Sequence, residues 1–317
     1  MPLVVRNESA IPKTSRICGT GPPSEHLLNA HSTFHQEGRM AREAPELVAR
    51  KTNVAQEIIV DTYIHVVTTS DQAWQYNSKK LAGLVANQSD VLNTAYSSFN
   101  ITFRTQPYTY TIHDSWATDL DDKAMKTALR QGNYSALNIY FQTNLSTPSP
   151  AGTMASTLLG YCTLPTNVTY TPASCPPQNR TDSGQCQKIP LATSTYINDG
   201  CNVLAATMPN NGLDSYQQGK TAVHEVGHWF GLLHTFMGES CDPSDPGDFV
   251  DDTAQESAST DGCPPLEGYT KDSCPDSPGT DPVHNFMDYS NDECYTDFTD
   301  DQKLRMVNMW NLYRSGN

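Results

Sequence analysis

The sequence is poor in positive charge. It has 20 Lys and Arg against 35 Asp and Glu, so its formal net charge is −15 at pH 7. A surface of this charge repels nucleic acid and anionic lipid, and we expect neither as a partner. The sequence also lacks the roughly 18 consecutive apolar residues of a membrane span, and its first residues lack the apolar core of a signal peptide. We therefore expect no membrane partner, and a leader that was removed or never existed.

Close cysteine pairs are absent too. None of the nine cysteines forms a CxxC pair, so neither a zinc ribbon nor a redox motif is indicated, whereas disulfides in an oxidising compartment fit. N-glycosylation sequons favour the same compartment. They begin at Asn7, Asn87, Asn100, Asn133, Asn144, Asn167 and Asn179. The sequence therefore predicts a secreted, disulfide-bonded glycoprotein.

The chain divides into a short polar segment and a longer remainder. Residues 1–55 have a weak helical pattern, and the basic residues between Arg39 and Lys51 would make this segment easy to cleave. Apolar periodicity predicts strands and helices in alternation, which is typical of an α/β sheet packed under helices. The predicted strands are 58–67, 101–104, 108–112 (a strand or a hairpin), 136–142 and 202–208, and the predicted helices are 81–99, 124–129 and 299–314. Residues 161–198 and most of the chain beyond 234 are predicted to be irregular.

The stretch "TAVHEVGHWFGLLHTF" (Thr221–Phe236) has the spacing of a metal site. His224 and His228 are four residues apart, so a helix places both on one face, one turn apart. If the helix continued, His234 would lie roughly 9 Å further along and about 120° around the axis. Gly231 removes this obstacle, because glycine adopts left-handed conformations and commonly ends helices. Three imidazoles would then bind zinc and leave a fourth position for water, as in catalytic sites.

Glu225 is the predicted general base of such a site. It follows His224 directly and points about 100° away from it, so it is poorly placed as a ligand. A carboxylate there can accept a proton from the zinc-activated water and pass it to a leaving amine. The alternatives are core or surface histidines and a solvated helix carboxylate.

The motif "HEVGHWFGLLHTF", together with "NFMDYS" (Asn285–Ser290), resembles the metzincin metalloproteases and, within them, the pappalysin family with its secreted fungal members. The resemblance implies an α/β (α+β), two-lobed zinc protease. A twisted mixed sheet and helices would lie above the cleft, and an irregular, disulfide-rich lobe below it. It implies a catalytic domain at 56–317, with the upper lobe ending at about 233, behind a pro-segment at 1–55.

The resemblance also assigns roles to two residues of the second motif. Met287 would form the methionine turn beneath the zinc, with ordinary core packing as the alternative. Tyr289 would contact the zinc or the tetrahedral intermediate and donate to the developing oxyanion, with a purely structural tyrosine as the alternative.

The same resemblance assigns the nine cysteines to two pairs, a group of four and one single residue. It implies the pairs Cys241–Cys274 and Cys263–Cys294, although spacing alone permits three pairings. Four others would pair among themselves with open connectivity: Cys162, Cys175, Cys186 and Cys201. Cys18 remains, in "SRICGT", which resembles the cysteine-switch segments of metzincin zymogens. Its thiolate would fill the open zinc position until cleavage near 39–51, and a leftover thiol or an intermolecular disulfide is the alternative.

An acidic loop at Asp242–Thr253 is a candidate calcium site. Calcium takes oxygen ligands of this kind, and some pappalysins bind structural calcium near the active site. Asp248, Asp251 and Thr253 are the candidate ligands. The loop has no EF-hand spacing, so a merely solvated acidic loop is the alternative.

Together these features predict a secreted, monomeric, zinc-dependent endopeptidase that acts on protein or peptide substrates. Two rivals stay open at this point. One is another zinc hydrolase, such as an aminopeptidase or amidase. The other is a glycoprotein binding module whose metal is structural.

Overall fold

The computed structural model describes residues 18–43, 57–146, 158–166, 193–264 and 270–316. Within these ranges a six-stranded sheet has the order β2-β1-β4-β6-β5, with β3 also pairing with β1. All pairs are parallel except β5 with β6, so the sheet is mixed, as expected. The strands are β1 (Ile58–Thr68), β2 (Ile101–Thr105), β3 (Thr109–Ile112), β4 (Leu137–Gln142), β5 (Gly160–Cys162) and β6 (Cys201–Leu204).

The strand β1 carries two strands along one of its edges. Its first half pairs with β2 up to Thr62↔Thr105, and its second half pairs with β3 from His65↔Thr109. Between these two pairs, β1 advances by three residues (62 to 65), whereas the chain that joins β2 to β3 advances by four (105 to 109). The extra residue makes a bulge around Pro107, which has no N–H to donate to the ladder. The hairpin alternative for 108–112 was wrong, because β3 runs parallel to β1.

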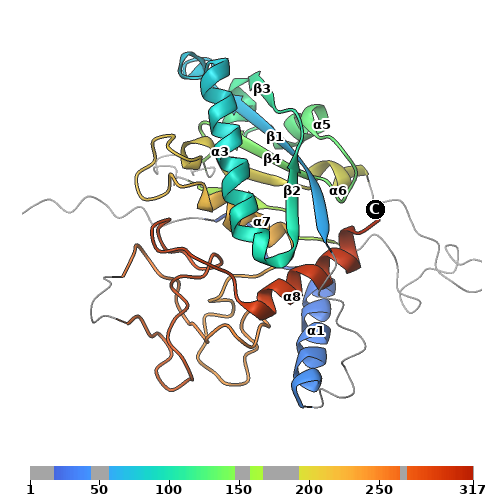
Figure 1. Cartoon of the computed structure of the whole chain (residues 1–317), viewed down its shortest axis with the longest axis vertical. Helices are drawn as coiled ribbons and strands as arrows, with labels where there is room; N and C mark the ends of the chain where they lie inside the picture. The colour runs from blue at the N-terminus through green and yellow to red at the C-terminus, as the bar shows by residue number, and fades with distance from the viewer. Residues whose placement is uncertain (1–17, 44–56, 147–157, 167–192, 265–269, 317) are drawn as a thin grey trace, which may run out of the picture.

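Helices cover both faces of the sheet (Figure 1). α3 (Ser78–Tyr96) and α7 (Lys220–Trp229) pack on the face that holds the largest core cluster. α4 (Asp114–Ala117) and α5 (Asp122–Leu129) cover the opposite face, where Val67, Ala117, Met125 and Tyr140 form a smaller cluster. α6 (Thr193–Asn198) lies against α5. Short 3-10 turns occur at Ala73–Gln75, Ser97–Phe99 and Ala205–Thr207.

The chain between α7 and α8 (Asp300–Met309) contains only isolated bridges within the residues described. The disulfides Cys241–Cys274 and Cys263–Cys294 hold it together, which are the pairs that the resemblance implied. Thr299 caps the start of α8 and forms a capping box with Gln302. A π-helical turn, Trp310–Arg314, ends the helix.

A third disulfide, Cys162–Cys201, joins β5 to β6 at directly paired positions. Cys175 and Cys186 lie outside the described residues, as do the sequons at Asn7, Asn167 and Asn179. The sequon asparagines that are described are all exposed: Asn87, Asn100, Asn133 and Asn144.

One sequence expectation needs correction. The segment 161–198, predicted to be irregular, contains most of β5 and all of α6. The weak helical pattern before residue 55 is confirmed by a long helix, α1 (Glu25–Glu43), which packs beside α8. Residues 44–56 lie outside the described ranges, so a domain boundary at 55 stays a prediction. No helix among the described residues is long and apolar enough to span a membrane.

Candidate active site

The turn that ends α7 has the geometry expected of Gly231. This glycine has φ +92°, and its N–H donates to the carbonyl of His228 at 2.8 Å. The N–H of Leu232 donates to the carbonyl of Gly227 at 2.9 Å. These two bonds form a Schellman motif, which requires a left-handed residue at the position that glycine occupies. The chain therefore reverses at Gly231 and returns along the end of the helix.

The reversal brings His234 to the two helix histidines. The Nε2 atoms of His228 and His234 lie 3.0 Å apart. The ring centroid of His224 lies 4.8 Å from that of His228 and 5.3 Å from that of His234. One ring nitrogen of each histidine and the sulfur of Cys18 all fall within 4.8 Å of one another. This is the convergence that the motif spacing predicted.

The second nitrogen of each helix histidine orients its ring. Nδ1 of His224 donates to the carbonyl of Phe286 at 2.6 Å, and Nδ1 of His228 donates to the carbonyl of Leu232 at 2.8 Å. A carbonyl only accepts, so the hydrogens sit on Nδ1 and the Nε2 lone pairs face the shared centre. Imidazoles and a thiolate are ligands that zinc prefers, and the donor set fits that ion.

Met287 is fully buried against the helix α7 that carries His224 and His228. A Cβ added to Gly227 would meet the Met287 sulfur at 2.5 Å, so a side chain at that helix position would displace the methionine. The side chain of Asn285 accepts from the Met287 N–H at 2.9 Å and pairs with the amide of Gln302. Gly227 and Asn285 fix the methionine against the histidine helix, and the sequence pattern of the motif did not single out either residue.

Glu225 is fully buried and lies under the N-terminal segment. Its Oε2 atom accepts from the Cys18 thiol at 3.5 Å and from the Thr20 hydroxyl at 3.3 Å. The Gly19 N–H donates to the carbonyl of Gly160 at 2.8 Å, so this segment adds to the free edge of β5 in parallel. The segment therefore covers both the carboxylate and the sheet edge. Thr20 and Gly160 were missed, because a three-residue strand has no distinct sequence signal.

Tyr289 borders the same centre. Its ring centroid lies 4.9 Å from that of His234 and 5.8 Å from that of His224. Phe236 packs against the Tyr289 ring at 4.8 Å and stacks on His234. The tyrosine is therefore at the metal site, and its chemical role stays a prediction.

The three candidate calcium ligands do not converge on one point. Asp251 pairs with His35 at 2.7 Å and with Arg42, both on α1. Asp248 accepts at Oδ1 from the Thr253 hydroxyl at 2.8 Å and from a backbone N–H. Within the described ranges, Cys18 and the three histidines are the only cluster with the spacing of a metal site. The calcium site stays a prediction that this geometry does not support.

Comparison with known proteins agrees with this geometry. Residues 200–311 match the family described as pregnancy-associated plasma protein-A. An extracellular metalloprotease of Aspergillus oryzae is 41 % identical over 314 residues, which cover 94 % of this chain and 90 % of that protein. One of Aspergillus fumigatus is 39 % identical over 318 residues, covering 95 % and 89 %.

Solved structures share the fold. Mature mirolysin of Tannerella forsythia, in complex with a cleaved peptide, is 23 % identical with a TM-score of 0.52, and the match covers 79 % of this chain and 90 % of that one. Because relatives near 40 % identity match over most of both chains, this protein belongs to the pappalysin family of metzincin metalloproteases and is a metallopeptidase.

Proposed function

We propose that this protein is a secreted zinc endopeptidase that is held latent by its own N-terminal segment. The observation that carries the proposal is the convergence of His224, His228 and His234 beside the buried carboxylate of Glu225. The names of the fungal relatives, all extracellular metalloproteases, support secretion.

The three histidines would hold the zinc ion through their Nε2 atoms. When bound there, zinc supplies an acidified water and polarises the scissile carbonyl. The Glu225 carboxylate would accept a proton from the attacking water molecule, and would later deliver that proton to the leaving amine as the C–N bond breaks. The Tyr289 hydroxyl donates to the oxygen on which negative charge develops.

The edge of β5 would bind the substrate. Gly160 already accepts a backbone hydrogen bond from Gly19, so an extended peptide can replace the N-terminal segment by strand addition. Strand addition uses the main chain of the substrate and needs no terminus, which favours cleavage within protein chains over removal of terminal residues.

Latency would come from Cys18. Its thiol lies among the three histidines and against Glu225, where the attacking water must be placed. Cleavage between Arg39 and Lys51 would free the segment. We propose residues 1–55, the segment predicted from the sequence, as the pro-segment.

The test is internal cleavage of a denatured protein by the trimmed enzyme, with and without a chelator. Glu225→Ala should lower kcat by at least about 100-fold, because removal of a general base costs about 10²–10⁴-fold. The matched control is Glu57→Ala, at an exposed glutamate before β1, which should leave kcat unchanged. An aminopeptidase would release only terminal residues, and a structural metal module would cut nothing. Wild-type turnover by Glu225→Ala would refute the general-base assignment.

A further inference from the structure

The strand β5 lies unusually close to Glu225. A Cβ built on Gly160 would meet Cγ of that glutamate at 2.8 Å and Cδ and Oε1 at 3.0 Å. Contacts this short require one of the two partners to move. The clash involves only the Glu225 side chain among the nearest atoms, so any residue larger than glycine at 160 would act directly on that carboxylate.

The strand has little freedom to retreat. Gly160 pairs with Val203 of β6, and the carbonyl of Leu159 accepts from the N–H of Leu204 at 2.8 Å. Two residues beyond Gly160, the disulfide Cys162–Cys201 fixes β5 covalently to β6. The backbone of residue 160 is thus held in place by β6.

The carboxylate is the part that would give way. Glu225 is fully buried in α7, and that helix is held by packing against the sheet and α3. The side chain can rotate, whereas the helix backbone cannot shift without moving the neighbouring histidines. An added methyl group would therefore turn the carboxylate away from its position beside the metal site.

We propose that Gly160 is a positioning residue, whose missing side chain sets the place of the Glu225 carboxylate. The proposal rests on the proposed role of Glu225 as the base. Gly160 does not have a positive φ, so alanine is compatible with the backbone, and its methyl group would point at Glu225 rather than at the substrate edge.

Gly160→Ala should lower kcat by about 10- to 100-fold, since a misplacement near 1 Å can cost about 10²-fold. KM and the bound zinc should stay within about twofold of wild type, because the strand edge and the histidines keep their places. The control is Gly83→Ala, at an exposed helix position where an added Cβ meets nothing within 4 Å.

A double-mutant cycle separates this role from general damage to the strand. Glu225→Ala removes Cγ and with it the clash, so Gly160→Ala should lower the residual kcat of the Glu225→Ala variant far less than it lowers the kcat of the wild type. Unchanged kcat, a rise in KM alone, loss of zinc or strict additivity would each overturn the proposal. Wild-type activity in Glu225→Ala would instead refute the proposed base.

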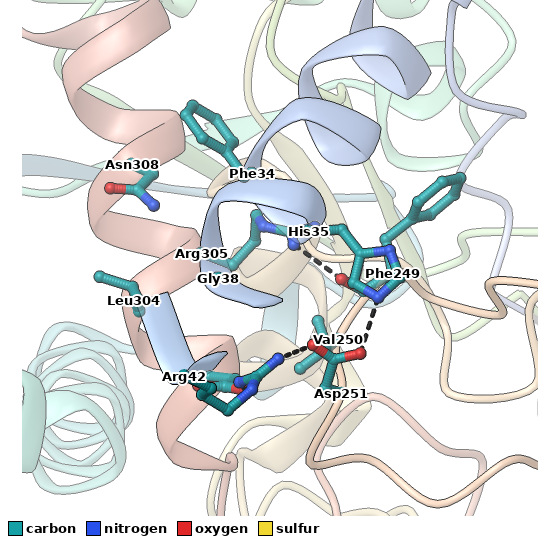
Figure 2. Close-up of a pocket in the computed structure, with 11 residues that line it drawn as sticks. Phe34, His35, Gly38, Arg42, Phe249, Val250, Asp251, Leu304, Arg305 and Asn308 are labelled. Carbon is teal, nitrogen blue, oxygen red and sulfur yellow. Dashed lines mark hydrogen bonds and ion pairs between the residues drawn. The ribbon is translucent and has the colours of Figure 1, made fainter. Parts of the chain in front are cut away.

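A second, independent observation concerns α1, which is seated on α8 and on the loop 249–251 (Figure 2). Leu27 of α1 is buried with Met309 and Tyr313 at one end of the contact. At the other end, Arg42 donates to Asp301 at 2.7 Å and pairs with Asp251. The pro-segment is thus held by a helix as well as by Cys18.

His31 lies at the centre of this contact and is fully buried. Its Nδ1 accepts a hydrogen bond from Arg305 of α8, and its ring lies 5.6 Å from that of Phe249. A second nitrogen of Arg305 donates to the carbonyl of Phe249 at 2.7 Å. The charged group facing His31 is therefore a guanidinium, which leaves no favourable place for an imidazolium.

We infer that α1 is a second anchor of the pro-segment and that this anchor weakens in acid. The inference rests on the proposed latency. Burial, and then the charge of Arg305, lowers the pKa of His31 from 6.5 to about 3, although the Gly231 backbone opposes this.

The sign follows from linkage. An undocked His31 takes up a proton below pH 6.5, whereas the docked imidazole resists protonation until about pH 3. Docking is therefore fully present above pH 6.5 and is progressively lost as the pH falls from 6.5 toward 3. At about pH 5 the docking equilibrium should be about 30-fold weaker than at about pH 8 from this residue alone.

Hydrogen exchange of residues 25–43 in the full-length, zinc-loaded chain at about pH 7.5 and about pH 5 tests the inference. After correction for intrinsic exchange, the wild type should lose far more protection in acid than His31→Gln or His31→Met. The control is His113→Gln, at an exposed histidine on the far side of the sheet, which should behave as the wild type. Equal acid loss in all variants, or no protection at either pH in both His31 variants, would overturn the inference without touching the Glu225 result.

Discussion

Replacing Gly231 with alanine tests whether the turn after α7 needs a left-handed residue. At φ +92° an L-residue is strained by about 1–2 kcal/mol. The new Cβ would also lie 3.0 Å from Cγ of Met309 and 3.2 Å from Cγ of Pro165, which adds part of the about 1–3 kcal/mol typical of overpacking. We expect the free energy of unfolding to fall by about 2–4 kcal/mol.

Urea denaturation in the presence of a chelator measures this loss apart from any effect on metal binding. Gly83→Ala provides a control of opposite sign, because alanine in an open helix position should raise stability by up to about 1 kcal/mol. A zinc titration should in addition show weaker binding by Gly231→Ala, since the turn positions His234. A free energy of unfolding for Gly231→Ala within about 0.5 kcal/mol of the wild type would refute the reasoning on the turn.

Two further predictions concern the irregular chain between α7 and α8. Burial raises the pKa of Asp248 from 3.8 to about 7, so this carboxyl by itself should lower the free energy of unfolding by about 4 kcal/mol between about pH 4 and about pH 8 in calcium-free buffer. Because buried His31 acts in the opposite direction, the fall is measured as the difference between the wild type and Asp248→Asn at each pH, and a difference that does not change with pH would refute it. Stabilisation of the wild type by added calcium at the higher pH would instead support the calcium site. Lys271 binds the buried carboxylates of Glu256 and Asp281, so Lys271→Ala should lower the free energy of unfolding by about 3–5 kcal/mol. Lys303→Ala, which removes the surface ion pair with Asp300, should lower it by less than about 1 kcal/mol. Similar losses for the two variants in urea unfolding would contradict this.

The convergence of the three histidines was readable in the sequence because its constraints are local. The spacing of His224, His228, Gly231 and His234 determines a helix, a reversal and a convergence within a short stretch of chain, and the structure has all three. The pairs Cys241–Cys274 and Cys263–Cys294 were predicted from the family resemblance, because spacing alone could not choose among the possible pairings.

The parts that the sequence did not reveal depend on contacts between distant segments. Gly160 owes its place to the sheet edge and to Glu225, which comes much later in the chain. Asp251 was a candidate calcium ligand in the sequence, but it contacts α1, and His31 of that helix contacts α8, so both belong to one contact surface. Such surfaces follow from the tertiary arrangement, which single-sequence periodicity does not describe.

The bulge at Pro107 makes the two borders of the sheet unequal. On the β2–β3 side, the missing N–H and the change of register leave no long ladder of free donors and acceptors for another molecule to extend. The β5 side, by contrast, already accepts a neighbouring backbone at Gly160. A peptidase that binds an extended polypeptide at a sheet edge is exposed to edge-to-edge association of its own sheets. Because the β2–β3 border is interrupted at Pro107, copies of this sheet cannot join one another through both of their borders in a continuous ladder, which works against such association.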